Sequence, residues 1–162
     1  MAEIRALSAD DWRQWRELRL RALQEDGFAF GSTYDEWVNA AEDQWRARLG
    51  LPESVNLIAV VDGVPVGMAS GVMNHEPRVV ELISMWIASE SRGSAIADAL
   101  ISAVSEWARP RADEVRLDVV STNSRAIAVY ERNGFAVTDE ARDREGCEIV
   151  MRKRIARTDS EE

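Results

Sequence analysis

Three consecutive apolar segments in the middle of the chain constrain the fold more than any other feature of the sequence. Two of them, within residues 56–73, flank the dipeptide Asp62-Gly63, which is a strong signal for a tight β-hairpin. The third, within residues 76–88, is long and nearly continuous in apolar residues, as expected for a buried strand. The sequence therefore predicts three antiparallel strands in succession.

The segment before these strands has the periodicity of helices. A short strand is expected at residues 3–8, and Ser8 with Asp11 three positions later resembles a capping box that opens a helix. The stretch 24–37 interrupts the helical period with two glycines, so we expect a loop there and a second helix over about 32–48.

The segment after the three strands alternates between helical and strand-like patterns. A wide apolar stripe predicts a helix that starts close to Ser94 and packs on the sheet. A strand over 114–122, a short helix over 123–134 and a last strand over 147–155 follow. The expected fold class is therefore α/β, with a mixed, mostly antiparallel sheet flanked by helices.

Length and charge limit the organisation and the partners. A chain of 162 residues with 46% hydrophobic residues is long enough for one domain, expected over 1–155, with a charged tail at 156–162. The net charge of −9 argues against a nucleic acid or an anionic membrane as partner, and it favours cationic small molecules or lysine-bearing targets.

Cysteine content and hydropathy bear on the compartment. The single cysteine, Cys147, cannot form an intramolecular disulfide or a thiolate metal cluster, and it is expected to be a small buried hydrophobe. No apolar run approaches the roughly 20 residues needed to span a bilayer, and the N-terminus has no signal core. We therefore expect a cytoplasmic protein without a metal site.

The start of the predicted helix near Ser94 is unusual because Arg92, Gly93 and two alanines precede or open it. The first amides of a helix have no internal partners and carry the positive end of the helix dipole, so small residues there allow a phosphate to approach the backbone. A pyrophosphate would suit such a site. The alternative is an ordinary turn from strand to helix.

Two motifs and the order of elements resemble the GNAT N-acetyltransferases, whose pattern is Arg/Gln-x-x-Gly-x-Gly/Ala followed by Asn-x-x-Ala-x-x-x-Tyr-x-x-x-Gly-Phe. The first motif matches at Arg92 and Ala97, and Ala95 stands at the position of the first family glycine. The second motif matches at Asn123, Ala126, Tyr130, Gly134 and Phe135. The resemblance covers about residues 56–155. It implies a GNAT-like acyl-CoA N-acyltransferase fold and transfer of an acetyl group from acetyl-CoA to a primary amine by direct attack.

The resemblance also implies which residues bind the co-substrate acetyl-CoA. They lie on the third apolar strand, on the loop and first turn of the next helix, and on the helix of the second motif. They are Met85, Trp86, Ile87, Arg92, Gly93, Ser94, Ala95, Ile96, Ala97, Asp98, Asn123 and Tyr130. Asn123 would equally serve as an ordinary helix N-cap.

Two residues are candidates for catalysis. Glu81 lies in an otherwise apolar strand, where a carboxylate is costly unless it is solvated or paired, and it is the candidate base for the amine. The alternatives are an edge position facing solvent and a salt bridge to Arg78. Tyr130 resembles the family tyrosine that protonates the leaving thiolate, and the alternative is a core aromatic.

The acceptor is expected to be an amine-bearing small molecule or peptide, and a homodimer is left open. Aromatic residues before and in the predicted second helix would either line an acceptor cleft or pack an irregular loop; they are Phe28, Phe30, Tyr34 and Trp37. His75 is expected to be an exposed loop residue. A non-catalytic acyl-CoA sensor stays open because of Ala95, whereas a dinucleotide-binding domain is disfavoured because no Gly-x-Gly-x-x-Gly follows a strand.

Overall fold

The computed structural model describes residues 2–27, 30, 32–93, 95–141 and 148–155. The predicted tail at 156–162 and the predicted roles of Phe28, Ser94 and Cys147 lie outside the described residues.

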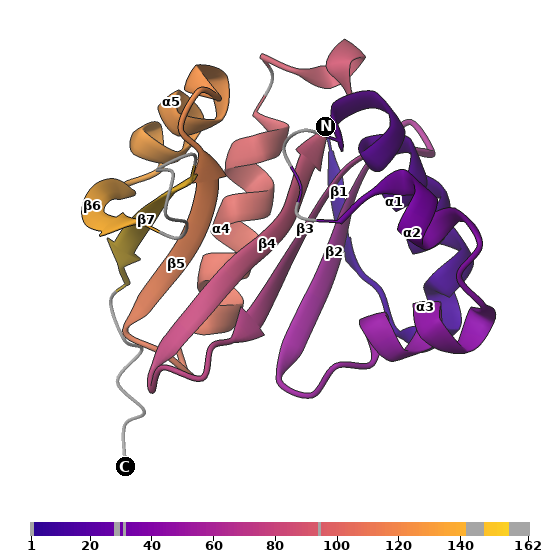
Figure 1. Ribbon diagram of the computed structural model, residues 1–162, viewed down its shortest axis with the longest axis horizontal. Helices are drawn as coiled ribbons and strands as arrows, with labels where there is room; N and C mark the ends of the chain where they lie inside the picture. Colours follow the sequence, from indigo (N-terminus) through magenta and orange to yellow (C-terminus); the bar gives the residue numbers. More distant parts are fainter. Residues whose placement is uncertain (1, 28–29, 31, 94, 142–147, 156–162) are drawn as a thin grey trace.

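A twisted sheet runs through the whole molecule (Figure 1). In the described residues it has seven strands in the order β1-β2-β3-β4-β5-β7-β6, and every neighbouring pair is antiparallel except the parallel pair β4–β5. The strands are β1 (Glu3–Ala6), β2 (Ser54–Val61), β3 (Val64–Met73), β4 (Val79–Ile87), β5 (Glu114–Val120), β6 (Ala136–Ala141) and β7 (Glu148–Arg154). This arrangement confirms the predicted α/β class with a mostly antiparallel sheet.

The predicted hairpin joins β2 and β3 at Asp62 and Gly63. Both residues have positive φ, 49° and 79°, which is the conformation that a type I′ turn requires. Val61 pairs with Val64 across the turn, and β4 pairs antiparallel with β3. The three successive antiparallel strands are therefore confirmed.

Helices cover both faces of the sheet, which is why its central strands are apolar on both sides. The helix α4 (Ile96–Ala108) covers the face toward which a side chain at Gly71 would point, since an added Cβ there would meet Val104 and Trp107. The helix α3 (Glu42–Leu49) covers the other face, where its Arg48 hydrogen-bonds to Ser70. The helices α1 (Trp12–Asp26) and α2 (Tyr34–Val38) lie beside α3 (Figure 1).

The single helix predicted over 32–48 is wrong, because the structure has α2 and α3 in its place. Thr33 caps α2 by accepting a hydrogen bond from the amide of Glu36, and the chain then leaves the helical conformation. Ala41 is extended, with φ −73° and ψ 160°, and its amide donates to the Gln44 side chain, which opens α3. Two capping interactions close together thus divide the helix.

Two further boundaries differ from the prediction. The short helical turn η3 (Ser89–Ser91) precedes the loop, and α4 starts at Ile96 instead of close to residue 94. The strand β6 was not predicted, because as the last strand of the sheet it presents polar residues to solvent and lacks an alternating apolar pattern.

In the described part of the chain, no helix is both long enough and apolar enough to cross a membrane.

Candidate active site

The strand β4 separates from β5 after three residues. Only Val79–Glu81 pair with β5, and in the described residues the β5-side edge of β4 has no ladder partner beyond that point. On its other edge, β5 pairs along its whole length with β7. Unpaired backbone groups therefore border an opening between β4 and the next elements, which is a place where an extended ligand can form backbone hydrogen bonds.

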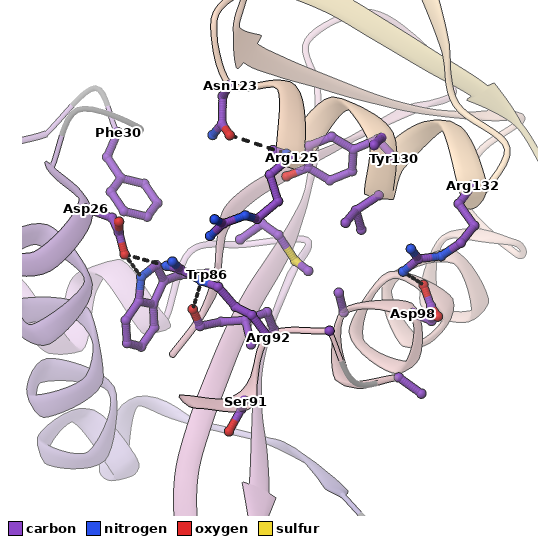
Figure 2. A pocket seen from close by; sticks show the side chains of 18 residues that line it. Asp26, Phe30, Trp86, Ser91, Arg92, Asp98, Asn123, Arg125, Tyr130 and Arg132 are labelled. Atoms are coloured by element: carbon purple, nitrogen blue, oxygen red, sulfur yellow. Dashed lines mark hydrogen bonds and ion pairs between the residues drawn. The ribbon is translucent and has the colours of Figure 1, made fainter. Parts of the chain in front are cut away.

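A cleft of about 730 Å³ occupies this opening between β4, the start of α4 and α5 (Ser124–Arg132), and we call it the α4–α5 cleft (Figure 2). It brings together most of the residues that the sequence predicts to bind acetyl-CoA. Those that line it are Met85, Trp86, Ile87, Arg92, Gly93, Ala95, Ala97, Asp98, Asn123 and Tyr130. Ile96 is the exception among the described residues, since its side chain is buried in the core and does not line the cleft.

The loop before α4 is open toward the cleft. Gly93 has φ 81°, a conformation that glycine adopts without strain, and a Cβ built there meets no atom within 4 Å. Ala95 is exposed with φ −76°, which suits any L-residue, so its place in the motif requires no glycine conformation.

Asp26, at the end of α1, ties this loop to β4. Its Oδ2 accepts hydrogen bonds from the Trp86 indole at 2.7 Å and from Nη2 of Arg92 at 2.6 Å (Figure 2). Arg92 also donates to the carbonyl of Ile87 at 3.0 Å. Although burial acts to raise the pKa of Asp26, the hydrogen bonds from Trp86 and Arg92 and the nearby charge of Arg125 lower it below its ordinary value.

The sequence places Asp26 among the residues that could line an acceptor cleft, but sequence reasoning missed its contacts with Trp86 and Arg92, and it missed Arg125 altogether. Asp26 belongs to no motif, and its partners lie 60 and 66 residues further along the chain. Arg125 lies inside the second motif at a variable position, and Figure 2 shows its side chain extending from α5 across the cleft toward Asp26. A cation at a variable position of a recognised motif is the signal that could have found it.

The charge of Asp98 in the first turn of α4 is already compensated. Its Oδ1 accepts hydrogen bonds from Asn133 and from Arg132, both at 2.8 Å. These two contacts lower the pKa of Asp98 and fasten the start of α4 to the end of α5. The carboxylate therefore acts as a link between the two helices that flank the cleft.

Tyr130 lies on α5 with its ring edge-on to Phe135 at a centroid distance of 5.8 Å. Its side chain is largely buried, and its phenol oxygen points into the cleft (Figure 2). Burial raises the pKa of the phenol above its ordinary value of 10.0, so the group holds its proton at neutral pH. Asn123 caps α5 by accepting from the amide of Ala126 at 3.3 Å, and it also lines the cleft.

A second cavity of about 360 Å³ adjoins the first on the side of α1 and α3, and we call it the α1–α3 cavity. Phe30 lines both spaces, and successive residues of β4 divide between them: Leu82–Ser84 line the α1–α3 cavity and Met85–Ile87 line the α4–α5 cleft. Of the aromatic residues predicted for an acceptor cleft, Phe30 and Trp37 line this cavity, whereas Tyr34 packs against the core.

Glu81 lines the α1–α3 cavity and not the cleft that contains Tyr130. Its carboxylate lies 3.4 Å from Nη1 of Arg116 and accepts a hydrogen bond from Asn74 at 3.1 Å. Neither of the two predicted alternatives to a base role is correct. The position is not an edge, because β4 is paired on both sides at Glu81. Arg78 pairs with Asp113 instead of Glu81.

Among the described residues, no group of three or more histidine, cysteine, aspartate or glutamate side chains could hold a metal ion. His75 is exposed in the turn before β4, as predicted.

The sequence model of the Acetyltransferase (GNAT) family matches residues 7–135, which include both motifs and most of the cleft. The chain belongs to the GNAT acetyltransferase family. No curated protein sequence matches this GNAT chain with significance.

Solved structures of GNAT proteins have the same fold. A GNAT-family acetyltransferase from Streptococcus pneumoniae is 17% identical, with a TM-score of 0.78 over 96% of this chain and 100% of that chain. The PaiA N-acetyltransferase from Thermoplasma acidophilum, in complex with coenzyme A, is 21% identical, with a TM-score of 0.73 over 95% and 99% of the two chains. The ribosomal-protein-S18-alanine N-acetyltransferase from Escherichia coli is 18% identical, with a TM-score of 0.67 over 100% and 99%. At such low identities these likenesses concern the fold alone.

Proposed function

We propose that this GNAT chain transfers the acetyl group of acetyl-CoA to the primary amine of a small molecule or peptide by direct attack. The observation that carries the proposal is the junction of two spaces at β4, because a cleft with a buried, protonated tyrosine adjoins a cavity with a carboxylate. A reaction between two substrates needs two adjoining sites and a proton donor and acceptor near them.

The residues of the α4–α5 cleft fit acetyl-CoA. The free amides at the start of α4, the open loop at Gly93 and the cations Arg92 and Arg125 suit a pyrophosphate. The unpaired edge of β4 offers backbone groups to the amide-containing pantetheine arm. When bound, acetyl-CoA supplies an acetyl thioester that is activated for attack by nitrogen.

The residues of the chain then move the protons. Glu81, directly or through water, takes one proton from the ammonium group of the acceptor, which frees the nitrogen lone pair. As the carbon–nitrogen bond forms and the carbon–sulfur bond breaks, Tyr130 gives its proton to the leaving thiolate and recovers one that the nitrogen releases. The amides of Met85 and Ile87, which alternate with those that face β3, are the candidate donors to the carbonyl oxygen, which gains negative charge during attack. The products are a neutral amide and a thiol, and the proton that Glu81 took passes to solvent.

The sensor alternative receives no support from the loop. It depends on Ala95, and the conformation of that residue is an ordinary one for alanine. A sensor also has no need for a buried phenol aimed into the cleft.

The test combines binding and turnover on the full chain. Calorimetry should detect acetyl-CoA binding, and a panel of amines should release free thiol together with a product whose mass has gained one acetyl group. Binding without thiol release from any amine would favour the sensor, and absence of acetyl-CoA binding would refute both functions. Replacement of exposed Arg13 on α1 is a matched control that should change neither result.

A further inference from the structure

The α1–α3 cavity has two chemically different walls. The strands β4, β5 and β7 contribute the carboxylates of Glu81, Asp118 and Glu148. The helices α1 and α3 contribute two arginines, Arg19 and Arg48, with tryptophans beside them. Acidic groups thus lie on the sheet side, and cationic and aromatic groups lie on the helix side.

The helix side contains three buried N–H donors that nothing in the described part of the chain accepts. They are Nε1 of Trp15, Nε1 of Trp45 and Nη1 of Arg19, and all three residues line the cavity. A buried polar group without a partner is costly, and in a native protein it usually indicates a ligand, a water or an ion. Because all three groups are donors, the missing partner is a hydrogen-bond acceptor.

The two arginines add uncompensated positive charge. Arg48 donates to Asn56, Ser70 and Ser84 at 2.8 to 3.2 Å, and all three acceptors are neutral. The guanidinium of Arg19 lies over the Phe30 ring at 4.5 Å. Neither arginine is within ion-pair distance of a described carboxylate, although the chain has 29 acidic residues.

Burial of this charge changes the pKa of both guanidinium groups. Burial, and for Arg19 also the charge of Arg48, lowers the pKa of each guanidinium to about 10. Both remain protonated at neutral pH, so the cavity holds two desolvated cations. An anionic oxygen would compensate them and also satisfy the free donors.

We propose that the α1–α3 cavity binds the acceptor as a zwitterionic amino acid, with its carboxylate toward Arg19, Arg48 and the tryptophan indoles and its amine toward Glu81. The proposal rests on the acetyl transfer proposed above and names the class of acceptor. The volume of about 360 Å³ is small for a ligand site and suits a single amino acid. The net charge of the chain suggests a purely cationic acceptor, whereas the residues that line the α1–α3 cavity favour an acceptor that also carries a carboxylate.

The first test uses three acceptors that differ only in the group that meets the arginines. Phenylalanine, phenylalaninamide and phenylethylamine share the amine and the ring, and similar trios exist for other amino acids. Thiol release should have a kcat/KM about 10- to 100-fold higher for the amino acid than for its two analogues, because only the carboxylate pairs with the buried cations. Equal rates, or a preference for the analogues without a carboxylate across several trios, would overturn the inference and leave the proposed function intact.

The second test changes the protein. Arg19→Gln should remove most of the preference for the carboxylate and act mainly on KM, while Arg13→Gln on the exposed face of the same helix should leave it unchanged. A readout that needs no turnover is the melting temperature with N-acetylphenylalanine or its amide as the added ligand. The acid, and not the amide, should stabilise the parent, and Arg19→Gln should abolish the difference.

These two readouts separate the two proposals. If no amine releases thiol but the acid still stabilises the parent through Arg19, acetyl transfer is refuted and carboxylate binding stands. If amines are acetylated but neither selectivity nor stabilisation depends on the carboxylate, the inference is wrong and acetyl transfer stands. The acceptor trios on the parent chain decide the inference even if the Arg19 variant fails to fold.

Discussion

Replacement of Tyr130 by phenylalanine separates the proton of the phenol from the packing of the ring. The Tyr130 side chain is 8% exposed, and its ring contacts Phe135 edge-on. No hydrogen bond joins the phenol to another residue in the part of the chain that the structure describes. The phenylalanine variant therefore keeps the packing, and its free energy of unfolding should change by less than about 1 kcal/mol.

The effect on turnover should be much larger. A positioned general acid contributes about 10²- to 10⁴-fold in rate, which corresponds to about 2.7–5.5 kcal/mol at about 1.4 kcal/mol for each factor of ten. We expect kcat to fall by this factor while the Kd of acetyl-CoA stays within about twofold, since the proton is needed only in the transition state. Thiol release, calorimetry and thermal melting measure the three quantities separately.

The raised pKa of the Tyr130 phenol also determines how turnover and stability depend on pH. A proton donor loses activity as the pH rises through its pKa, and burial raises the pKa of Tyr130 above 10.0. Ionisation of Tyr130 should therefore cause no loss of turnover in the parent below pH 10. In that range the pH profiles of the parent and of Tyr130→Phe should have the same shape. The unfolded phenol ionises at its ordinary pKa while the buried one does not, so the parent should lose stability above pH 10 relative to the variant.

Tyr130→Ala is the packing control. It removes the ring as well as the proton and should cost about 3–5 kcal/mol of stability. The reasoning is refuted if Tyr130→Phe turns over at the parent rate but melts well below it, because the tyrosine would then be a hydrogen-bonded core residue. Loss of acetyl-CoA affinity in the phenylalanine variant would likewise make it a binding group.

Four other substitutions test the rest of the site. Gly93→Leu should raise the Kd of acetyl-CoA about tenfold and cost only about 1–2 kcal/mol of stability from its φ of 81°, and unchanged affinity by calorimetry would exclude the loop as the phosphate site. Glu81→Gln should reduce kcat/KM most at low pH, where less free amine exists, by up to about 10²- to 10⁴-fold, and full activity from pH 6 to 10 would place the base elsewhere. Gly71→Ala and Gly67→Ala each place a Cβ 2.9 Å from a side-chain carbon and should cost about 1–3 kcal/mol. Only Gly67→Ala should also weaken acetyl-CoA binding, because the carbon it displaces belongs to Ile87, and equal affinities in the two variants would contradict this.

Features set by neighbours in the chain could be predicted from the sequence. The hairpin at Asp62-Gly63 depends on two backbone conformations that these residue types adopt, and the cap at Asn123 depends on an amide three positions away. Most of the residues predicted to bind acetyl-CoA line the α4–α5 cleft, because two motifs and the family resemblance of the preceding strand indicate them, whereas the roles of Asp26 and Arg125 there were missed. Local chemistry and motif spacing were sufficient for most of this half of the site.

The other half depends on contacts between distant segments. Arg19 on α1 and Trp45 on α3 line one cavity only because α1 and α3 pack together, and the sequence between them gives no periodic signal for that. The net charge pointed to a cationic acceptor, whereas the buried lining of the α1–α3 cavity contains two unpaired cations. A whole-chain charge describes the exposed surface, and the charge that an acceptor meets is determined by a few buried side chains.

A β-bulge in β4 joins the two spaces. Ile83 pairs with Ser70 and Trp86 pairs with Met68, so β4 has one more residue than β3 in this interval, and Ser84 has φ 55°. The partners Ser70 and Met68 are two apart on β3 and therefore share a face of the sheet. Ile83 and Trp86 lie on that same face, which α1 covers, although they are three apart in the chain.

The consequence is that one short piece of strand serves both substrates. Trp86 reaches Asp26 on α1, and through that carboxylate it holds Arg92 in the loop proposed for acetyl-CoA. Ser84 at the bulge accepts a hydrogen bond from Arg48, one of the two cations proposed to hold the acceptor carboxylate. If the same sequence paired with β3 without a bulge, Trp86 would lie three residues from Ile83 and face α4, and its contact with Asp26 would be lost. The bulge thus places the proposed acceptor site and the proposed acetyl-CoA loop on opposite ends of Ser84–Trp86, where the amine and the thioester have to meet.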